Sequence, residues 1–434
     1  MVGRESHVGF TTNPHALSES IVRLARQQTA TTRTEIAEAT AAGKSIITQR
    51  VAELVGAGIL IDEGTAASTG GRAPRALRFN RGGALLIGVE INAARIDVVA
   101  TDFTGTIVLQ TSEEHDVRDG PVATLARVID LIDRVKHALP PGSPPVLGVG
   151  VGLPGPVDFT AGSMVSPPSL PAWNAYPFRA RLARALGTEV WVDNDVNAMV
   201  VGERALDDDR SLQNVIVVNI GLGIGAGLFI DGRLYRGSDG GAGDIGHVAY
   251  GDSNVPCFCG KTGCLSTIAG GVALTEMARS HAGGSESAIL GEVVRRAGRL
   301  TLHEVADAVA LGDPFCIGIV AEAGRQIGRV ISLMVGVLNP SLVILAGELC
   351  VDSDVLLTAV RTSVIAHAPT IASRALEIRN SRLGTWSGAI GAAQMCIDEL
   401  LTADRIRSWV ESGGRAFAEA PAVVAPAVSA RPVH

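Results

Sequence analysis

Apolar residues recur at helical spacing three times between residues 15 and 58. The first of these segments places apolar residues from Leu17 to Ala25 on one face. The second begins at residues 32–34, where threonine hydroxyls can cap a helix that has Glu35 in its first turn. A short turn with a glycine separates it from the third segment, 44–55. This spacing predicts a helix-turn-helix.

The third predicted helix has an apolar and a polar face. Short apolar segments at 59–61 and 76–79 follow it and predict two strands, joined by a flexible loop at 64–71. These elements predict a winged helix-turn-helix domain over residues 14–80. We expect the apolar face to enter its core with Ile46, Ile47, Val51 and Leu54.

The polar face and the wing carry residues suited to DNA. Basic and amide side chains on such a helix contact phosphates and base edges, and arginines beside glycine suit the minor groove. Any short three-helix domain has a polar face, however, so only the whole order of elements supports this interpretation. The expected DNA contacts are Arg33, Lys44, Ser45, Thr48, Gln49, Arg50, Arg72 and Arg75.

After residue 80 the pattern changes to short buried strands that alternate with helices. A first series runs through 84–90, 96–101, 106–109, a helix at 122–139, and strands at 146–151 and 190–192; a second begins with 215–218 and 227–230. The repeated series predicts an α/β protein with two lobes around a cleft. We expect the lobes to span 84–200 and 201–400, and the Ala-, Pro- and Val-rich tail 413–434 to be disordered.

Composition and charge narrow the class of protein. With 434 residues and 47% hydrophobic residues, the chain can bury several cores. Its longest apolar run, 330–351, is broken by Asn339 and Pro340 and predicts a helix and a buried strand, not a membrane span. Residues 1–81 hold ten Lys and Arg against seven Asp and Glu, which leaves −10 for the remainder of a chain whose net charge is −7. A basic head on an acidic body is typical of a DNA-reading module attached to a sensor.

One histidine and three cysteines cluster between residues 247 and 264: His247, Cys257, Cys259 and Cys264. This is the ligand set of a closed, tetrahedral zinc site with a structural role. The alternatives are buried free thiols, a disulfide or chance clustering. The N-terminus lacks the apolar segment of a secretory signal, so we expect a cytoplasmic protein, in which thiols stay reduced.

The same stretch resembles the signature of the ROK family of repressors and kinases, in which Gly-His is followed by Cys-x-Cys-Gly-x-x-Gly-Cys. Here these residues are Gly246 and His247, then Cys257 to Cys264. The resemblance implies an actin/hexokinase-like fold over 84–400 and a sugar pocket next to the zinc loop. It also implies that His247 both binds zinc and touches the sugar, although a purely structural role is the alternative. Many regulators of this family begin with a winged helix, which its sugar kinases lack.

The resemblance also implies which residues contact the sugar. In family kinases the acid at the position of Asp195 removes a proton from a sugar hydroxyl, and the preceding asparagine, Asn194, binds a neighbouring hydroxyl. Without the family, Asp193 or Asp195 would be interpreted as a helix cap. Three further positions depart from the family pattern and carry shorter side chains, so that the pocket either accepts a different saccharide or has lost its ligand: Ser169, Asp244 and Ser266.

The resemblance to kinases is weakest where phosphates would bind. Family kinases carry Asp-x-Gly-Gly-Thr in the first hairpin, whereas this chain has Glu90, Asn92 and two alanines. Without the glycines, backbone amides approach a phosphate less closely. The second loop keeps Gly221, Gly223 and Gly225 but has Leu222 in place of a threonine. We therefore do not expect ATP as a ligand.

The sequence favours a sugar-responsive transcriptional regulator, a repressor that binds operator DNA as a homodimer or homotetramer, without a membrane partner. Two alternatives remain open at this point. One is an ATP-dependent sugar kinase with an accessory DNA-binding domain. The other is a regulator that binds DNA without any ligand.

Overall fold

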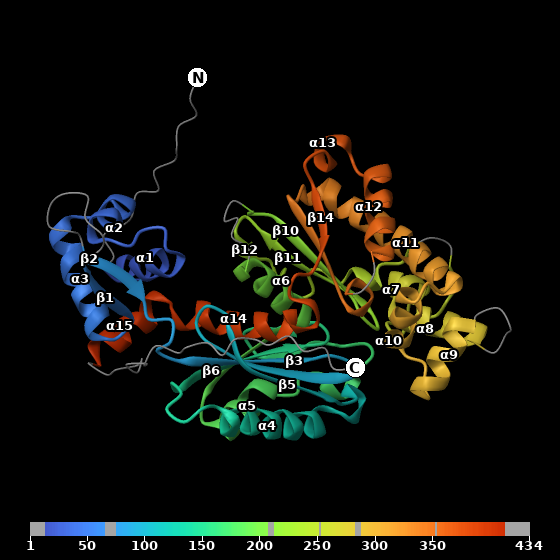
Figure 1. The fold of residues 1–434 in the computed structure, drawn as a ribbon, viewed down its shortest axis with the longest axis horizontal. Coiled ribbons are helices and arrows are strands. Elements are labelled where there is room, and N and C mark those ends of the chain that lie inside the picture. Colours follow the sequence, from blue (N-terminus) through green and yellow to red (C-terminus); the bar gives the residue numbers. More distant parts are fainter. Residues whose placement is uncertain are drawn as a thin grey trace.

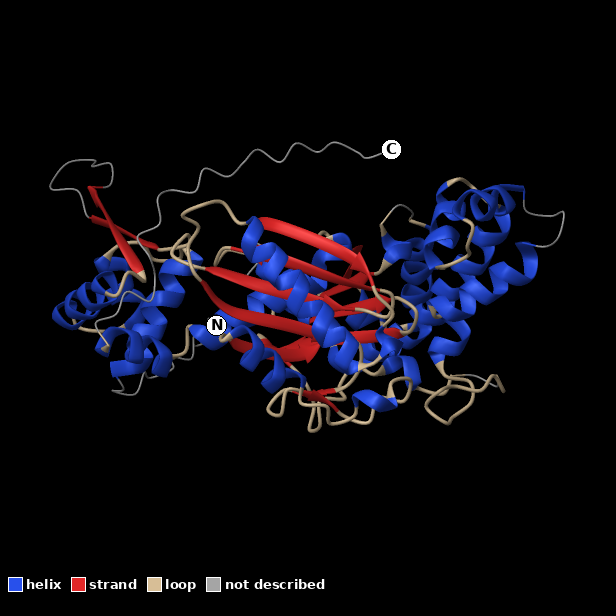
Figure 2. Ribbon diagram, turned by 90° about the horizontal axis from the view of Figure 1, so that it is seen from below, coloured by secondary structure: helices blue, strands red, loops and turns tan. Residues whose placement is uncertain are grey.

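The computed structural model describes residues 14–65, 75–206, 212–250, 253–282, 288–351 and 354–412. Three parts follow one another along its long axis: an N-terminal module, a first lobe and a second lobe (Figure 1). Figure 2 shows the same order from below, with the strands of the lobes between the N-terminal helices and the helices of the second lobe. The expected tail 413–434 and the tip of the wing at 66–74 lie outside the described residues.

The N-terminal module has the predicted order of elements. Helices α1 (Pro14–Gln27), α2 (Arg33–Thr40) and α3 (Lys44–Gly56) precede strands β1 (Leu60–Thr65) and β2 (Arg75–Phe79), which pair antiparallel. The predicted cap of α2 is confirmed, since the Thr32 hydroxyl accepts a hydrogen bond from the Glu35 amide and the Glu35 carboxylate accepts one from the Thr32 amide. Thr32 and Glu35 thus fix where the second helix begins.

The expectation that Ile46 of α3 enters the core was wrong. Ile47, Val51 and Leu54 are fully buried, but 51% of Ile46 is exposed. The buried positions are spaced by four and three residues, which keeps them on one side of the helix. Ile46 is displaced from that stripe by one residue, or about 100° around the helix axis. It therefore lies on the same exposed face as the polar residues.

The two lobes repeat one sheet topology, which confirms the predicted two-lobed actin/hexokinase-like fold. The first sheet has the order β5-β4-β3-β6-β9 and the second β12-β11-β10-β13-β14. In each, three antiparallel strands are followed by two strands parallel to the first of them. The strands of the first sheet are β3 (Leu85–Ile91), β4 (Arg95–Thr101), β5 (Ile107–Glu114), β6 (Val146–Leu153) and β9 (Glu189–Asn194); those of the second are β10 (Val215–Ile220), β11 (Ile224–Ile230), β12 (Arg233–Leu234), β13 (Leu342–Ala346) and β14 (Glu377–Asn380).

Helices separate the two sheets and cover their outer faces. Helices α4 (Pro121–Ala138) and α5 (Phe178–Leu186) pack on the outer face of the first sheet (Figure 1). Helix α6 (Asp195–Leu206) packs on the second sheet and against α14 (Ser387–Leu400), which lies on the first sheet. The remaining outer helices belong to the second lobe: α7 (Leu265–Ala269), α8 (Gly271–Ala282), α9 (Ala288–Ala297), α10 (Leu302–Ala310), α11 (Pro314–Leu338), α12 (Val355–His367) and α13 (Thr370–Ser373).

Helix α14 lies within the range expected for the second lobe but packs against β3 and β6 of the first. Gly88 and Gly150, which face each other in these strands, allow this contact. A Cβ atom on either would stand 1.8 Å from a carbonyl oxygen of α14. On the opposite side, Gly391 of α14 meets the backbone of α6, where an added Cβ would lie 1.8 Å from the Ala198 oxygen. Close backbone contacts at these three glycines therefore hold α14 between the lobes.

We expect Gly391→Ala to destabilise the protein by about 1–3 kcal/mol, because α6 and α14 would have to separate to accommodate the methyl group. Gly318→Ala is the matched control, since Gly318 is also helical and an added Cβ there meets nothing within 4 Å. It should be neutral or stabilise by up to about 1 kcal/mol through helix propensity. Thermal unfolding of both variants measures the difference, and equal midpoints would contradict the packing argument.

The N-terminal module is joined to the first lobe by a continuous apolar core. Ile21 and Leu54 of the module belong to the same buried cluster as Ile397 and Leu400 of α14. The last helix, α15 (Ala403–Glu411), packs on α1. At the edge of this contact the Arg26 guanidinium lies 3.4 Å from Asp398 and 3.3 Å from Gln394. The end of α14 therefore touches the module directly.

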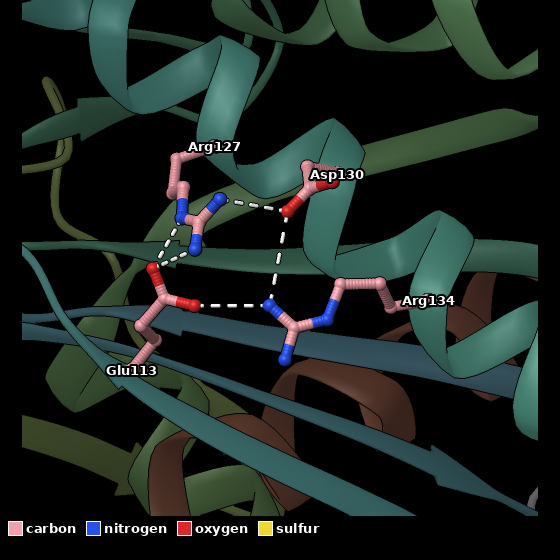
Figure 3. A network of polar contacts seen from close by, with 4 residues as sticks. All are labelled: Glu113, Arg127, Asp130 and Arg134. Atoms are coloured by element: carbon pink, nitrogen blue, oxygen red, sulfur yellow. Dashed lines mark hydrogen bonds and ion pairs between the residues drawn. The ribbon is translucent and has the colours of Figure 1, made fainter.

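Strand β5 extends beyond its predicted end at Leu109. Its last residues lie at the sheet edge and alternate between half-buried and exposed positions, so they do not form the apolar run that predicts a buried strand. Glu113 on this strand binds Arg127 and Arg134 of α4, with the Arg134 contact at 3.0 Å (Figure 3). The hydrogen bond from Arg127 is the largest cause of the lowered pKa of Glu113. The next residue, Glu114, instead pairs with Arg299 of the second lobe at 2.8 and 3.3 Å. The edge of the first sheet is thus linked to α4 and to the second lobe.

Within the described ranges, the helices are too short or too polar to cross a membrane. The longest apolar run of the sequence forms the second half of α11 and strand β13. Asn339 ends α11 in the left-handed conformation, with φ of 44°. The predicted break of the apolar run at Asn339 and Pro340 is therefore where the helix ends.

Candidate sugar, metal and DNA sites

The first group of candidate residues lies where β9 ends and α6 begins. Asn194 caps α6, because its Oδ1 accepts hydrogen bonds from the amides of Val196 and Asn197 at 3.0 and 3.2 Å. Its Nδ2 donates to the Gly155 oxygen and to Asp195 Oδ1, at 3.0 and 2.8 Å. The cap is therefore Asn194, and neither Asp193 nor Asp195 has that role. Both ends of the Asn194 carboxamide are engaged within the protein.

Asp195 is the most perturbed acid of this group. Only 8% of it is exposed, and burial raises the pKa of Asp195 to about 7, which the hydrogen bonds from Val196 and Asn194 partly oppose. A carboxyl group with this pKa can accept or hold a proton near neutral pH. The position at the end of a parallel strand is where α/β folds bind ligands. The arrangement is suited to hydrogen bonding with a hydroxyl.

The glycine-rich loop between β10 and β11 lies against this helix start. An added Cβ at Gly225 would lie 3.1 Å from Val196 Cγ2, next to Asp195. Ser266 accepts a hydrogen bond from the Ile224 amide at 3.0 Å, so its hydroxyl holds the loop that carries Gly221, Gly223 and Gly225. An added Cβ at Gly246 would lie 2.3 Å from the same hydroxyl. Ser266 thus joins the glycine loop to the segment of His247.

The other two expected sugar contacts, Ser169 and Asp244, are exposed. Asp244 stands directly before the short 3-10 helix Ile245–His247, without a side-chain hydrogen bond to that helix. Ser169 precedes a second short 3-10 helix, Pro171–Trp173. Contacts between backbone and side chains therefore bring Asp195, Ser266 and the His247 segment together. The structure shows Ser169 and Asp244 only as accessible side chains.

The first hairpin differs from a phosphate cradle in its hydrogen bonds. Asn92 Oδ1 accepts from the amides of Ala94 and Arg95 at 3.1 and 2.9 Å. The Arg95 guanidinium binds Asp97 at 2.7 Å and the Thr385 oxygen at 3.2 Å. The two amides at the tip of the hairpin are thus already occupied by a side chain of the same turn.

Glu90 is buried beneath the first turn of α14, with 2% exposed. Burial is the largest cause that raises its pKa well above the usual range, and the charges of Asp97 and Asp195 add to it. An added Cβ at Gly388 would lie 2.3 Å from the Glu90 carboxylate. Glu90 therefore fills the space between the hairpin and α14.

The candidate metal ligands converge. The ligand atoms of His247, Cys257, Cys259 and Cys264 all lie within 4.8 Å of one another. His247 Nδ1 is 3.3 Å from Cys257 Sγ, and Cys259 Sγ is 3.5 Å from Cys264 Sγ. One nitrogen and three sulfurs at these separations fit a zinc ion, which such donors bind at about 2.0–2.3 Å in a tetrahedron.

Backbone turns bring the cysteines together. Gly260 and Gly263 have φ of 86° and 67°, the left-handed region that glycine adopts without strain. The Cys257 amide donates to the Lys261 oxygen at 2.8 Å, and Leu265 donates to Val248 at 3.1 Å. The described cluster can therefore hold a zinc ion.

The candidate DNA face of α3 is exposed. Lys44, Ser45, Thr48 and Gln49 are exposed, whereas Arg50 is half-buried and paired with Glu53 at 2.6 Å. Gln49 also donates to Glu53, at 3.0 Å.

The remaining expected DNA contacts belong to α2 and the wing. Arg33 pairs with Asp62 at 3.1 Å, so a contact with DNA would have to break or share this pair. Arg72 lies outside the described residues. Arg75 is the first residue of β2, and only its backbone is described.

Sequence reasoning missed two residues near these sites, Arg236 and Phe159. Arg236 pairs with Asp193 at 2.7 Å and lies over the Phe159 ring, 4.0 Å from its centroid. The sequence around Arg236 does not indicate its partners, because Arg236, Asp193 and Phe159 come together only in the fold.

Comparison with known proteins finds similarity to both regulators and kinases. Over 372 residues it is 25% identical to the xylose repressor of Caldicellulosiruptor bescii, a match that covers 85% of this chain and 92% of the relative. It is 27% identical over 307 residues to the glucokinase of Halalkalibacterium halodurans, which covers 70% of this chain and 92% of that enzyme. The match to the repressor therefore extends over more of this chain.

A solved structure agrees in fold. It is a ROK family transcriptional regulator described as a homologue of the Escherichia coli MLC protein, with a TM-score of 0.77 and 20% identity over 92% of this chain and 99% of that one. Residues 86–399 also match the ROK family as a whole. This match covers most of the chain and both lobes, and the chain belongs to the ROK family.

Proposed function

We propose that the protein is a sugar-responsive DNA-binding transcriptional regulator, and specifically a repressor. The observation that carries this proposal is the exposed polar face of α3, on a helix-turn-helix whose core is continuous with a two-lobed domain. Such a helix reads the major groove, and its dimer reads two half-sites. We therefore also propose that the protein acts as a homodimer or a larger even-numbered oligomer, and that it is cytoplasmic.

The relatives support the direction of this proposal. The relative from Caldicellulosiruptor bescii is named a xylose repressor, and its match covers 85% of this chain against 70% for the glucokinase. Occupation of the Ala94 and Arg95 amides by Asn92 argues against a phosphate site in the first hairpin. The cluster at His247 supports a zinc ion with a structural role, since its four donors leave no open position for water.

In the proposed mechanism, a sugar binds between the lobes beside Asp195, Ser266 and His247. Hydroxyl groups would hydrogen-bond to the Asp195 carboxylate and to the donors around it. Because α14 lies between the lobes and touches the N-terminal module through Gln394 and Asp398, a change in lobe closure would alter the position of α1. The spacing of the two reading helices in a dimer would then change, and the operator would be released.

The test begins with genomic fragments that the purified protein retains. We expect Lys44→Ala combined with Gln49→Ala to weaken binding to such a fragment at least about tenfold, because a phosphate contact and a base contact are lost together. Arg23→Ala is the matched control, since Arg23 is an exposed arginine on α1 of the same module. It should change the affinity less than about twofold. Fluorescence anisotropy at fixed salt measures all three proteins.

Equal affinity of the double variant and the wild type would refute the proposed recognition face. Adding D-xylose, D-glucose or N-acetylglucosamine tests the second half of the proposal, because the effector should release the fragment. Turnover of ATP with any of these sugars, abolished by Asp195→Asn, would instead establish the sugar kinase.

A further inference from the structure

Arg236 lies where three chain segments that carry candidate sugar contacts meet. It lies two residues after the end of β12 in the second lobe, but its side chain reaches the first lobe. Its Nε donates to Asp193 Oδ2 at 2.7 Å, and its guanidinium carbon lies 4.0 Å from the centroid of the Phe159 ring. These contacts connect residues that are separated by 43 and 77 positions in the chain.

The first segment is the end of β9. Asp193 is completely buried, and Arg236 neutralises it. The other oxygen, Oδ1, accepts hydrogen bonds from the Asn194 amide at 2.7 Å and from Asn197 Nδ2 at 2.8 Å. These two partners flank Asp195 on both sides. The carboxylate held by Arg236 therefore also holds the turn that presents Asp195.

The second segment is the loop of Arg236 itself, which leads to Asp244 and His247. The Arg236 oxygen accepts a hydrogen bond from the Ala242 amide at 3.2 Å, which closes the loop. Gly240 has φ of 75°, and an added Cβ there would lie 2.1 Å from the Val157 oxygen of the first lobe. The loop is thus pressed against the first lobe just before the candidate sugar and metal ligands.

The third segment is the hairpin of β7 (Val157–Asp158) and β8 (Ser163–Met164), which leads to Ser169. Phe159 lies in its turn, and the Phe159 oxygen accepts a hydrogen bond from Arg179 at 3.3 Å. The planar guanidinium of Arg236 both donates to a carboxylate and stacks on this ring. A lysine could supply the charge but not the stack.

We propose that Arg236 is a positioning residue that holds the Asp195, His247 and Ser169 segments in the arrangement that binds the sugar. This inference rests on the proposed sugar site. Arg236 itself does not contact the sugar. Its role goes beyond neutralising Asp193, because it also stacks on Phe159 and closes its own loop. Breaking the pair leaves a completely buried carboxylate without its ion-pair partner, so the turn at 193–197 has to rearrange.

The test measures hydrogen–deuterium exchange of the full-length protein before any sugar is added. In Arg236→Ala we expect the amides of 194–197 and 242–247 to exchange at least about tenfold faster, as local opening becomes easier. Arg233→Ala is the matched control, because Arg233 is an exposed arginine three residues earlier. Amides of α2 and α3 should be unchanged in both variants. Wild-type exchange at 194–197 in Arg236→Ala would overturn the positioning role.

The second measurement concerns release from the retained DNA fragment. The concentration of D-xylose or D-glucose that releases half of the protein should rise at least about tenfold in Arg236→Ala, with operator affinity in the absence of sugar within about twofold of the wild type. Arg236→Lys should recover part of the response, because the charge on Asp193 is again compensated. An unchanged half-release concentration in Arg236→Ala would overturn the proposal.

If no tested sugar releases the wild type, the proposed function fails and the role of Arg236 in sugar binding fails with it. The exchange data still decide separately whether Arg236 orders the three segments. Should Arg236→Ala not fold, the comparison of Arg236→Lys with the wild type applies, with faster exchange at 194–197 expected to a lesser degree. Exchange identical to the wild type in that variant, together with an unchanged sugar response, would show that the stack has no role.

Discussion

Replacement of Cys259 by serine is expected to abolish zinc binding and to loosen the loop that carries all four candidate ligands. The described contacts that close this loop are a few backbone hydrogen bonds and the convergence of three sulfurs with His247. Thiolate ligands of zinc contribute folding free energy directly, so their loss destabilises the surrounding backbone. We expect the thermal midpoint to fall by about 5–10 °C, equivalent to roughly 2–3 kcal/mol for a lobe of this size.

Thr262→Ala is the control for this variant, because Thr262 is exposed in the same loop and supplies no ligand. Elemental analysis should find close to one zinc per chain in the wild type and in Thr262→Ala, and much less in Cys259→Ser. Full zinc content in Cys259→Ser, or a wild type that contains none after purification without chelator, would contradict the metal site. A loss of sugar response in the same variant would show that the position of His247 depends on the ion.

Asp195→Asn is expected to abolish the sugar response and at the same time to stabilise the free protein above neutral pH. Burial raises the pKa of Asp195 to about 7. A raised pKa means that the folded protein keeps the proton while the unfolded chain, with an ordinary carboxyl group, releases it. The stabilising contribution of Asp195 is therefore fully present below about pH 4 and is lost as the pH rises to about 7.

Above pH 7 the folded protein has to hold a buried charge, and asparagine removes this penalty. The difference in free energy of unfolding between Asp195→Asn and the wild type should thus grow between pH 4 and 7 and reach a few kcal/mol at pH 8. Asp133→Asn, an exposed position on α4, provides the control and should show no such pH-dependent difference. Denaturant unfolding at pH 5 and pH 8 measures the effect. A constant difference at both pH values would mean that Asp195 titrates as an ordinary carboxyl group.

These two variants separate stability from function at neighbouring positions of one site. Loss of a metal ligand should lower both stability and sugar response, because the loop itself is disturbed. Loss of the Asp195 charge should lower the response while it raises stability. A buried acid that reduces stability is typical of a residue retained for its chemistry.

Much of the architecture followed from local patterns. The cap of α2 was evident because Thr32 and Glu35 are three residues apart, and the break after α11 because Asn339 precedes a proline. The repeated strand series indicated two lobes. The cluster of candidate metal ligands was visible because its four residues lie within one short stretch, which folds into a single loop. Signals of this kind depend on residues close in sequence.

Other features depended on the packing of distant segments and had no such signal. The exposure of Ile46 is decided by which side of α3 meets α1 and β1, and the length of β5 by the position of that strand at the sheet edge. The Asp195 environment, with its pKa of about 7, arises only when β9, α6 and the glycine loop come together. Asn92 accepts hydrogen bonds from the amides of Ala94 and Arg95, and this likewise depends on a side-chain conformation that the sequence does not indicate.

The sequence by itself indicated the order of elements in the N-terminal module, the two α/β lobes, the four candidate metal ligands and the family to which the chain belongs, because each depends on periodicity or on short motifs. Only the tertiary structure decided that α14 lies between the lobes and reaches the N-terminal module, and that Arg236 meets Asp193 and Phe159. The physical reason is that these contacts require a backbone approach through glycines and ion pairs between residues far apart in the chain, which no local pattern encodes.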